Sequence, residues 1–124
     1  MADLTIASRE AHRQTTESSI EQITAFLEEV LGRKLVAKLA GVQDPKAVGR
    51  WASGERTPRP AAEERLRIAY QVFRLLLAEE SKFTIRAWFI GLNPQLDDES
   101  PLLAIRDGHF QEVMVAAKAY VAGG

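Results

Sequence analysis

The sequence contains no cysteine. A chain without thiols forms no disulfide, thiolate metal site or cysteine nucleophile, and it is compatible with a reducing compartment. The chain also lacks any apolar run near the roughly 18–20 residues that span a bilayer. Its first residues, MADLTIASREAHRQ, have none of the apolar core of a signal peptide. These absences predict a soluble, cytoplasmic protein without a membrane partner.

Groups suited to catalysis or metal binding are also scarce. The two histidines, His12 and His109, lie far apart in the sequence. The chain has no phosphate-binding glycine loop, no nucleophile beside a base and no cluster with metal-ligand spacing. The acids Asp97, Asp98 and Glu99 are adjacent, a pattern typical of a solvated loop. We therefore expect no enzyme activity, no cofactor and no metal site.

Charge is distributed unevenly, although the net charge is only −1. Residues 33–59 contain seven basic and two acidic residues, a net charge of +5, so the remaining 97 residues carry −6. A basic segment in an otherwise acidic chain is the usual footprint of a phosphate-binding face. On charge alone, a solvated basic helix surface is an equally good interpretation.

The spacing of apolar residues predicts an all-α fold. Helices are expected over about 19–31, 33–41, 45–53, 60–80, 82–90, 101–107 and 109–121. Ser18 and Glu21 have the spacing of a capping box at the start of the first of these helices. The run WFI, residues 88–90, has the composition of a strand, but no second such run exists to pair with it.

Three segments are expected along the chain. Residues 1–17 are polar and weakly periodic, which predicts a mobile arm or a frayed first helix. Residues 18–81 form a DNA-binding domain that includes a long connecting helix, and residues 82–124 form a second, smaller helical domain. The helix over 60–80 is apolar on more than one face, so it needs partners on two sides.

Two short helices, over 33–41 and 45–53, are separated by a tight turn and predict a helix-turn-helix. In this motif the second helix lies in the major groove of DNA. Asp44 suits the cap of that helix and Pro45 suits its first position. Val48 and Trp51 share one side. We expect Trp51 to anchor the helix to the core rather than to contact DNA.

The residues on the opposite side of that helix, and those flanking it, are the candidates for DNA contacts. Arg50 is expected to make a bidentate contact to guanine and Ala47 to meet a thymine methyl group. Gly49 permits close approach of the backbone to DNA or to the preceding helix, and Arg56 and Arg59 contact phosphates. The predicted DNA-binding residues are Gln43, Lys46, Ala47, Gly49, Arg50, Ser53, Arg56 and Arg59.

Two stretches resemble known families. VAKLAGV…AVGRWASGERTP resembles the Xre/Cro-type helix-turn-helix, with one residue more between Val42 and Val48, which implies a longer turn and shifts the register of the base-reading residues. RAWFIGLNPQLDDESPLLAIRDGHFQEVMVAAKAYVAGG is similar to the toxin-binding domain of the Xre/MbcA/ParS antitoxin family. The two similarities cover about residues 20–80 and 83–124, in the order of that family. They imply an N-terminal Xre/Cro-like bundle followed by a small helical C-terminal domain.

The resemblance implies an antitoxin of a type II toxin-antitoxin system. Such antitoxins block the active site of a RES-domain toxin that consumes NAD, and they repress their own operon by binding double-stranded operator DNA. The acidic run Asp97-Asp98-Glu99 departs from the family, whose members often carry glycine or another charge there. The residues expected to contact the toxin are Trp88, Asn93, Pro94, Leu96, Pro101, Arg106, Asp107, Gly108, Tyr120, Val121 and Gly124.

Two other functions fit the same sequence. A stand-alone Xre-type repressor would use its C-terminal part only to dimerise. A pure interaction module would carry a degenerate helix-turn-helix. Because helix-turn-helix proteins commonly bind DNA as dimers, we expect a homodimer. Its interface is expected on the broad apolar helix over 60–80 or on the C-terminal part.

Overall fold

The computed structural model describes residues 3–123, and within this range it contains helices and no strand. The predicted all-α class is therefore confirmed, and the run WFI lies in a helix. The elements are α1 (Leu4–Glu17), α2 (Ile20–Leu31), α3 (Arg33–Ala40), α4 (Lys46–Ser53), α5 (Pro60–Leu76), α6 (Lys82–Ile90), a 3₁₀ turn η1 (Pro94–Leu96), α7 (Pro101–Arg106) and α8 (Phe110–Val121).

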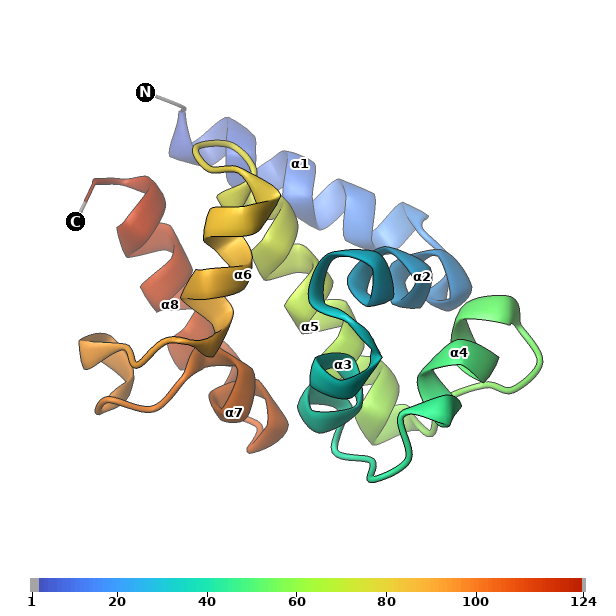
Figure 1. The fold of residues 1–124 in the computed structure, drawn as a ribbon. Helices are drawn as coiled ribbons and strands as arrows, with labels where there is room; N and C mark the ends of the chain where they lie inside the picture. Colours follow the sequence, from blue (N-terminus) through green and yellow to red (C-terminus); the bar gives the residue numbers. More distant parts are fainter. Residues whose placement is uncertain (1–2, 124) are drawn as a thin grey trace.

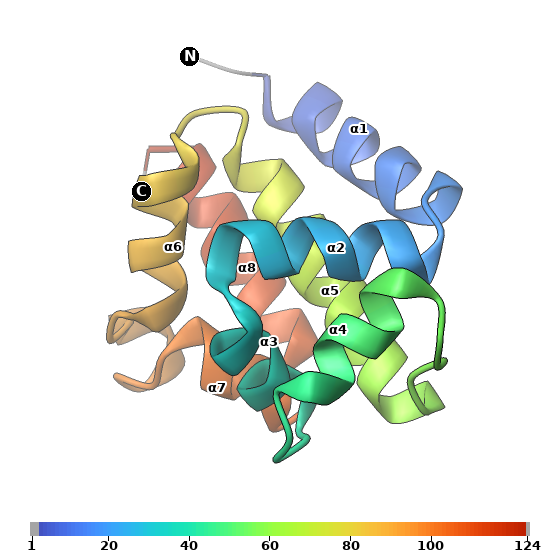
Figure 2. The same cartoon turned by 45° about the vertical axis from the view of Figure 1, so that its right-hand side comes forward.

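Helix α5 runs through the middle of the molecule (Figures 1 and 2). Helices α1, α2, α3, α7 and α8 all pack against it, and its Leu66, Phe73 and Leu76 are buried. The prediction that this helix has partners on two sides is confirmed. It ends at Leu76 rather than near residue 80. After α5 the backbone forms a 3₁₀-type turn, since the amide of Ala78 donates to the carbonyl of Leu75 at 3.2 Å.

Of the two alternatives expected for residues 1–17, a mobile arm or a frayed first helix, the structure contains a helix, because residues 4–17 form α1. The Asp3 carboxylate caps it by accepting hydrogen bonds from two amides of the first turn, at 2.8 and 3.2 Å. The helix packs along α5 and buries Ala11 and Thr15. Because these buried residues are small or polar, no apolar stripe marks the helix in the sequence. Residues 1 and 2 of the expected arm lie outside the described range.

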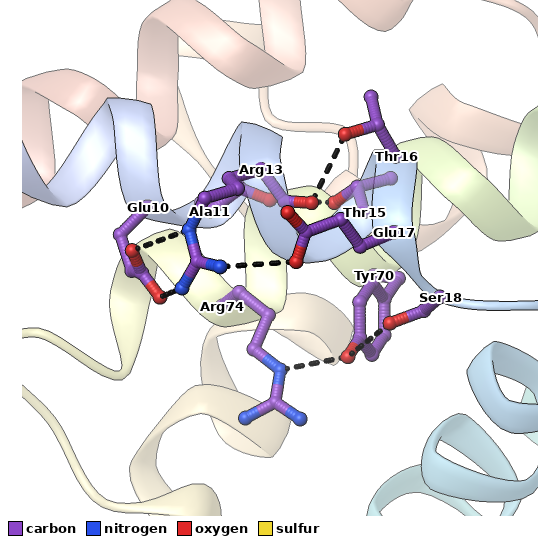
Figure 3. A network of polar contacts seen from close by, with 9 residues as sticks. All are labelled: Glu10, Ala11, Arg13, Thr15, Thr16, Glu17, Ser18, Tyr70 and Arg74. Atoms are coloured by element: carbon purple, nitrogen blue, oxygen red, sulfur yellow. Dashed lines mark hydrogen bonds and ion pairs between the residues drawn. The ribbon is translucent and has the colours of Figure 1, made fainter.

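Polar contacts surround the junction of α1 and α5 (Figure 3). On the exposed face of α1, the Arg13 guanidinium pairs with the Glu10 and Glu17 carboxylates. Below it, Arg74 Nε donates to the Tyr70 hydroxyl at 3.0 Å, and this hydroxyl lies 3.5 Å from the hydroxyl of Ser18. Exposed ion pairs contribute little stability, so the packing of α1 on α5 is the larger effect.

Helix α2 begins one residue later than the sequence predicted. Its capping box uses Ser19 and Gln22, with Gln22 N donating to Ser19 Oγ at 3.1 Å and Ser19 N donating to Gln22 Oε1 at 2.9 Å. The predicted pair, Ser18 and Glu21, is therefore wrong. Ser18 instead ends α1, and consecutive serines made the two registers equivalent in the sequence.

Phenylalanine rings join the two segments that the sequence divided. Phe26 of α2 meets Phe73 of α5 edge to face at 5.3 Å, and Phe73 stacks on Phe89 of α6 at 5.8 Å. The buried side chains form one cluster that extends from α1 to α8, and α7 also packs against α3. Residues 18–81 and 82–124 therefore share one hydrophobic core.

Candidate nucleic-acid interface and C-terminal groove

Helix α4 buries one face and exposes the other. Val48 and Trp51 are buried, as expected of anchors, and α4 packs mainly against α2 and to a lesser extent against α3. Lys46, Arg50 and Ser53 are exposed, and their spacing of four and three residues aligns them along the helix. A row of three exposed polar side chains therefore runs the length of α4, at the end of the molecule away from α6 and α8 (Figure 1).

The turn between α3 and α4 is set by one glycine and one aspartate. Gly41 has a φ of +84°, and the amide of Val42 reaches back to the carbonyl of Ala37 at 3.0 Å, which ends α3. Asp44 then closes the turn, because its Oδ1 accepts a hydrogen bond from Lys46 N at 2.9 Å. Pro45, expected as the first helical residue, is the N-cap instead, and α4 begins at Lys46. The exposed Gln43 lies between these two positions, at the start of the polar row.

Gly49 faces another part of the protein. A Cβ at this position would lie 2.6 Å from Nη2 of Arg33, the first residue of α3. Arg33 is paired with the Glu28 carboxylate of α2. The sequence left two close approaches open at Gly49, one to DNA and one to the preceding helix. The structure contains the approach to the preceding helix, so Gly49 is not part of the exposed row on α4.

Four arginines gather at a groove between the end of α3, α4 and the start of α5. The groove has a volume of about 530 Å³ and is lined by Arg50, Arg56, Arg59 and Arg65, with Ala47 among the small residues between them. Four of the predicted DNA-binding residues, Ala47, Arg50, Arg56 and Arg59, thus lie together in this groove, which we call the basic groove. Arg65 was not predicted, because it belongs to α5 and stands outside the basic segment of the sequence.

A second groove, of about 420 Å³, lies between α6, the turn η1 and α8. Its lining includes Trp88, Asn93, Pro94 and Tyr120, four residues that the resemblance assigns to toxin binding. The sequence did not single out Leu92, which also lines this groove and is 77% exposed. An exposed leucine beside a half-buried tryptophan is typical of an interaction surface.

Other residues expected to contact a toxin have different positions. Leu96, Pro101 and Val121 are buried, so they hold the second groove's walls together rather than offer a surface. Arg106 and Asp107 do not line the groove; Arg106 Nε donates to Asp107 Oδ1 at 3.1 Å, and this hydrogen bond lowers the pKa of the Asp107 carboxyl. Gly108, with a φ of +84°, ends α7. Gly124 lies outside the described residues.

One hydrogen bond fixes the rim of the second groove. The Tyr120 hydroxyl of α8 donates to Oε1 of Glu80, after the end of α5, at 2.8 Å. This hydrogen bond raises the pKa of the Tyr120 phenol, because it holds the proton on the oxygen. Tyr120 also meets Trp88 edge to face, with ring centroids 6.5 Å apart. Glu80 was not predicted, since it is 40 residues from its partner.

The loop beside the second groove presents acidic residues on a tight backbone. The Asn93 carbonyl accepts hydrogen bonds from Leu96 N at 2.9 Å and Asp98 N at 3.0 Å, which closes the loop. Asp97 and Asp98 then adopt positive φ values of 54° and 64°, a conformation that aspartate tolerates better than most residues. Both carboxylates are exposed, so this rim of the groove is acidic.

Comparison with models of protein families, with characterised proteins and with solved structures finds no significant match to this chain. Within residues 3–123, no three histidine, aspartate or glutamate side chains gather in a way that would hold a metal ion. No helix in the described range has the length and apolar character needed to cross a membrane. The basic groove and the second groove each have a shape and a chemistry that suit a partner.

Proposed function

We propose that this cytoplasmic protein binds double-stranded operator DNA through a helix-turn-helix made by α3 and α4. The observation that carries the proposal is the exposed row of Lys46, Arg50 and Ser53, opposite the buried Val48 and Trp51. Side chains on one face of a short helix can reach base edges in the major groove. The closed turn before α4 and the arginines after it support the same function, and the resemblance to Xre/Cro-type proteins adds repression of the protein's own operon.

Arg50→Ala tests the DNA-binding proposal. Losing one bidentate base contact is expected to weaken operator binding by about 1–3 kcal/mol. The fold should survive, because Arg50 is exposed. Arg9→Ala, an exposed arginine of α1, is the matched control and should bind normally. Equal affinity of Arg50→Ala and wild type, or no binding by wild type, would favour a degenerate helix-turn-helix in an interaction module.

We further propose that the second groove docks a RES-domain toxin and that this protein is an antitoxin that blocks the toxin's NAD-consuming site. The proposal is supported by the convergence of Trp88, Asn93, Pro94 and Tyr120 on one groove, because these residues were assigned to the toxin by resemblance. The adjacent acidic loop would repel DNA, so it suits a protein partner. Leu92→Glu should break the complex and leave operator binding unchanged.

The proposed homodimer forms through α6. Of the two interfaces that the sequence suggested, α5 is unavailable, because its apolar residues are buried within one chain. On α6, Phe83 is 84% exposed and Ile90 is 46% exposed, and their separation of seven residues puts them on one face. A second copy packed there would cover both side chains and supply the second reading helix for the other operator half-site.

A further inference from the structure

The arginines of the basic groove come from three parts of the chain. Arg50 belongs to α4, Arg56 and Arg59 to the connector that follows it, and Arg65 to the second turn of α5. Small residues, including Val42, separate them and leave the groove open. No aspartate or glutamate is among the residues that line it. The groove therefore presents four positive charges without a compensating carboxylate.

Four other arginines of this protein are neutralised by the protein itself. Arg13, Arg33, Arg67 and Arg106 each pair with a carboxylate. Among the described residues, by contrast, the side chains of Arg50, Arg56 and Arg59 have no hydrogen-bond or ion-pair partner. Like charges that converge on one hollow repel each other. An anion in the groove would remove this repulsion, and guanidinium groups match phosphate oxygens in pairs.

Arg65 is held in position before any ligand arrives. It is half-buried, and its Nη1 donates to the carbonyl of Ala40, the last residue of α3, at 3.0 Å. The same nitrogen would lie 2.7 Å from a Cβ at Gly41, so the glycine makes room for it. A guanidinium has five N–H donors, and this hydrogen bond uses one of them. A fixed arginine loses little conformational entropy when it binds.

We propose that this groove seats a phosphate of the DNA backbone beside the reading helix, and that Arg65 is a phosphate-contacting residue. The inference rests on the DNA-binding function proposed above. The shared chemistry is a phosphate group, which a DNA strand or a free phosphate ion could supply. Because Arg65 is hydrogen-bonded to the end of α3, its position relative to Arg50 on α4 is fixed. A DNA strand that binds Arg65 in the groove is therefore placed in a defined register with Arg50.

The test is the salt dependence of DNA binding, measured by fluorescence anisotropy in increasing KCl. The probes are a duplex from upstream of the protein's own gene and a scrambled duplex of the same length. Losing one phosphate contact reduces the magnitude of the slope of log K against log salt by about 0.9. Raising the salt from 50 to 200 mM should therefore weaken DNA binding by Arg65→Gln roughly 3.5-fold less than it weakens binding by wild type. Both duplexes should be weakened equally, because phosphate contacts carry no sequence information.

Two controls separate this effect from loss of fold or of charge. Arg65→Lys keeps the charge and should keep most of the slope. Arg9→Gln removes an exposed charge of α1, outside the groove, and should match wild type in slope. Thermal unfolding, followed by circular dichroism, reports whether the variants are folded. If folded Arg65→Gln keeps the wild-type slope, the inference is overturned while the proposed function stands.

A titration with inorganic phosphate, at constant ionic strength and followed by NMR, distinguishes the two sources of phosphate. If the groove serves a DNA strand, wild type should bind the duplexes far more tightly than free phosphate, and Arg65→Gln should weaken both. If wild type binds free phosphate at Arg65 but neither duplex, both this inference and the proposed DNA-binding function are overturned.

Discussion

Arg33 lies over Gly49. The guanidinium of the first residue of α3 fills the space where a side chain at position 49 would begin, with Nη2 2.6 Å from the Cβ position. Arg33 is also paired with Glu28, so α2, α3 and α4 meet at one glycine. Helix α4 therefore lies against the Arg33 guanidinium at Gly49, and its buried Val48 and Trp51 anchor it to the core.

Substitution of two glycines by alanine should have different effects. Gly49→Ala gains up to about 1 kcal/mol of helix propensity and displaces only the flexible end of Arg33, whose exposed pair is worth about 0–1 kcal/mol. Its stability should therefore stay within about 1 kcal/mol of wild type. Gly41→Ala should lose about 1–2 kcal/mol, because a left-handed φ of +84° is unfavourable for alanine.

Urea denaturation followed by circular dichroism measures both free energies of unfolding. A larger loss in Gly49→Ala than in Gly41→Ala would mean that the contact of Arg33 with Glu28 contributes more than an exposed pair. Operator affinity, measured in parallel, should be nearly unchanged in Gly49→Ala, since position 49 faces Arg33.

Trp51 should behave as an anchor of α4. It is only 6% exposed, and truncating a buried tryptophan to alanine costs about 3–5 kcal/mol. Trp51→Ala should therefore be strongly destabilised in chemical denaturation, while Trp51→Phe should remain folded and bind operator DNA. A Trp51→Phe protein of wild-type stability that no longer binds DNA would instead make Trp51 a DNA contact.

The sequence predicted the helices that have a continuous apolar face, and it gave the helix without such a face only as one of two alternatives. The bounds of α2, α3 and α6 agree with the sequence to within a residue or two, because each combines periodic apolar residues with a glycine or a cap. Helix α1 was expected only as an alternative to a mobile arm, because its interface with α5 uses Ala11 and Thr15. A buried alanine or threonine carries no signal in a hydrophobic pattern.

From spacing alone, the candidate sites were predictable only where they follow one helix. The exposed row on α4 comes from a period of 3.6 residues, so Lys46, Arg50 and Ser53 could be chosen from spacing alone. Arg65 could not, because it joins the groove through a hydrogen bond to Ala40 that is set by helix packing. The same holds for Glu80, whose partner Tyr120 lies 40 residues away.

The Tyr120 phenol should titrate above its usual pKa of 10.0, because its proton is shared with the Glu80 carboxylate. Because the folded-state pKa lies above the unfolded-state value, the hydrogen bond from Tyr120 to Glu80 stabilises the folded state fully below pH 10. This stabilisation of the fold is lost as the pH rises through the folded-state pKa. Glu80→Gln should lower the Tyr120 pKa. NMR with ring-labelled tyrosine distinguishes Tyr120 from Tyr70. An identical pKa in both proteins would show that the hydrogen bond is absent in solution.

Phe83→Glu should convert the proposed dimer into a monomer. Phe83 is 84% exposed in one chain, so a charge there costs little in the monomer but is costly when covered by a second copy. Sedimentation velocity over a range of protein concentrations measures the change. Arg9→Glu, on α1, is the control for an added negative charge. A dimer that persists in Phe83→Glu would place the interface elsewhere.

Co-expression with the gene adjacent to this one tests the antitoxin proposal most directly. We predict that the neighbouring protein alone stops growth, that this protein restores it, and that the two co-purify with wild type but not with Leu92→Glu. A harmless neighbour that forms no complex with this protein would contradict the antitoxin function and leave a stand-alone repressor.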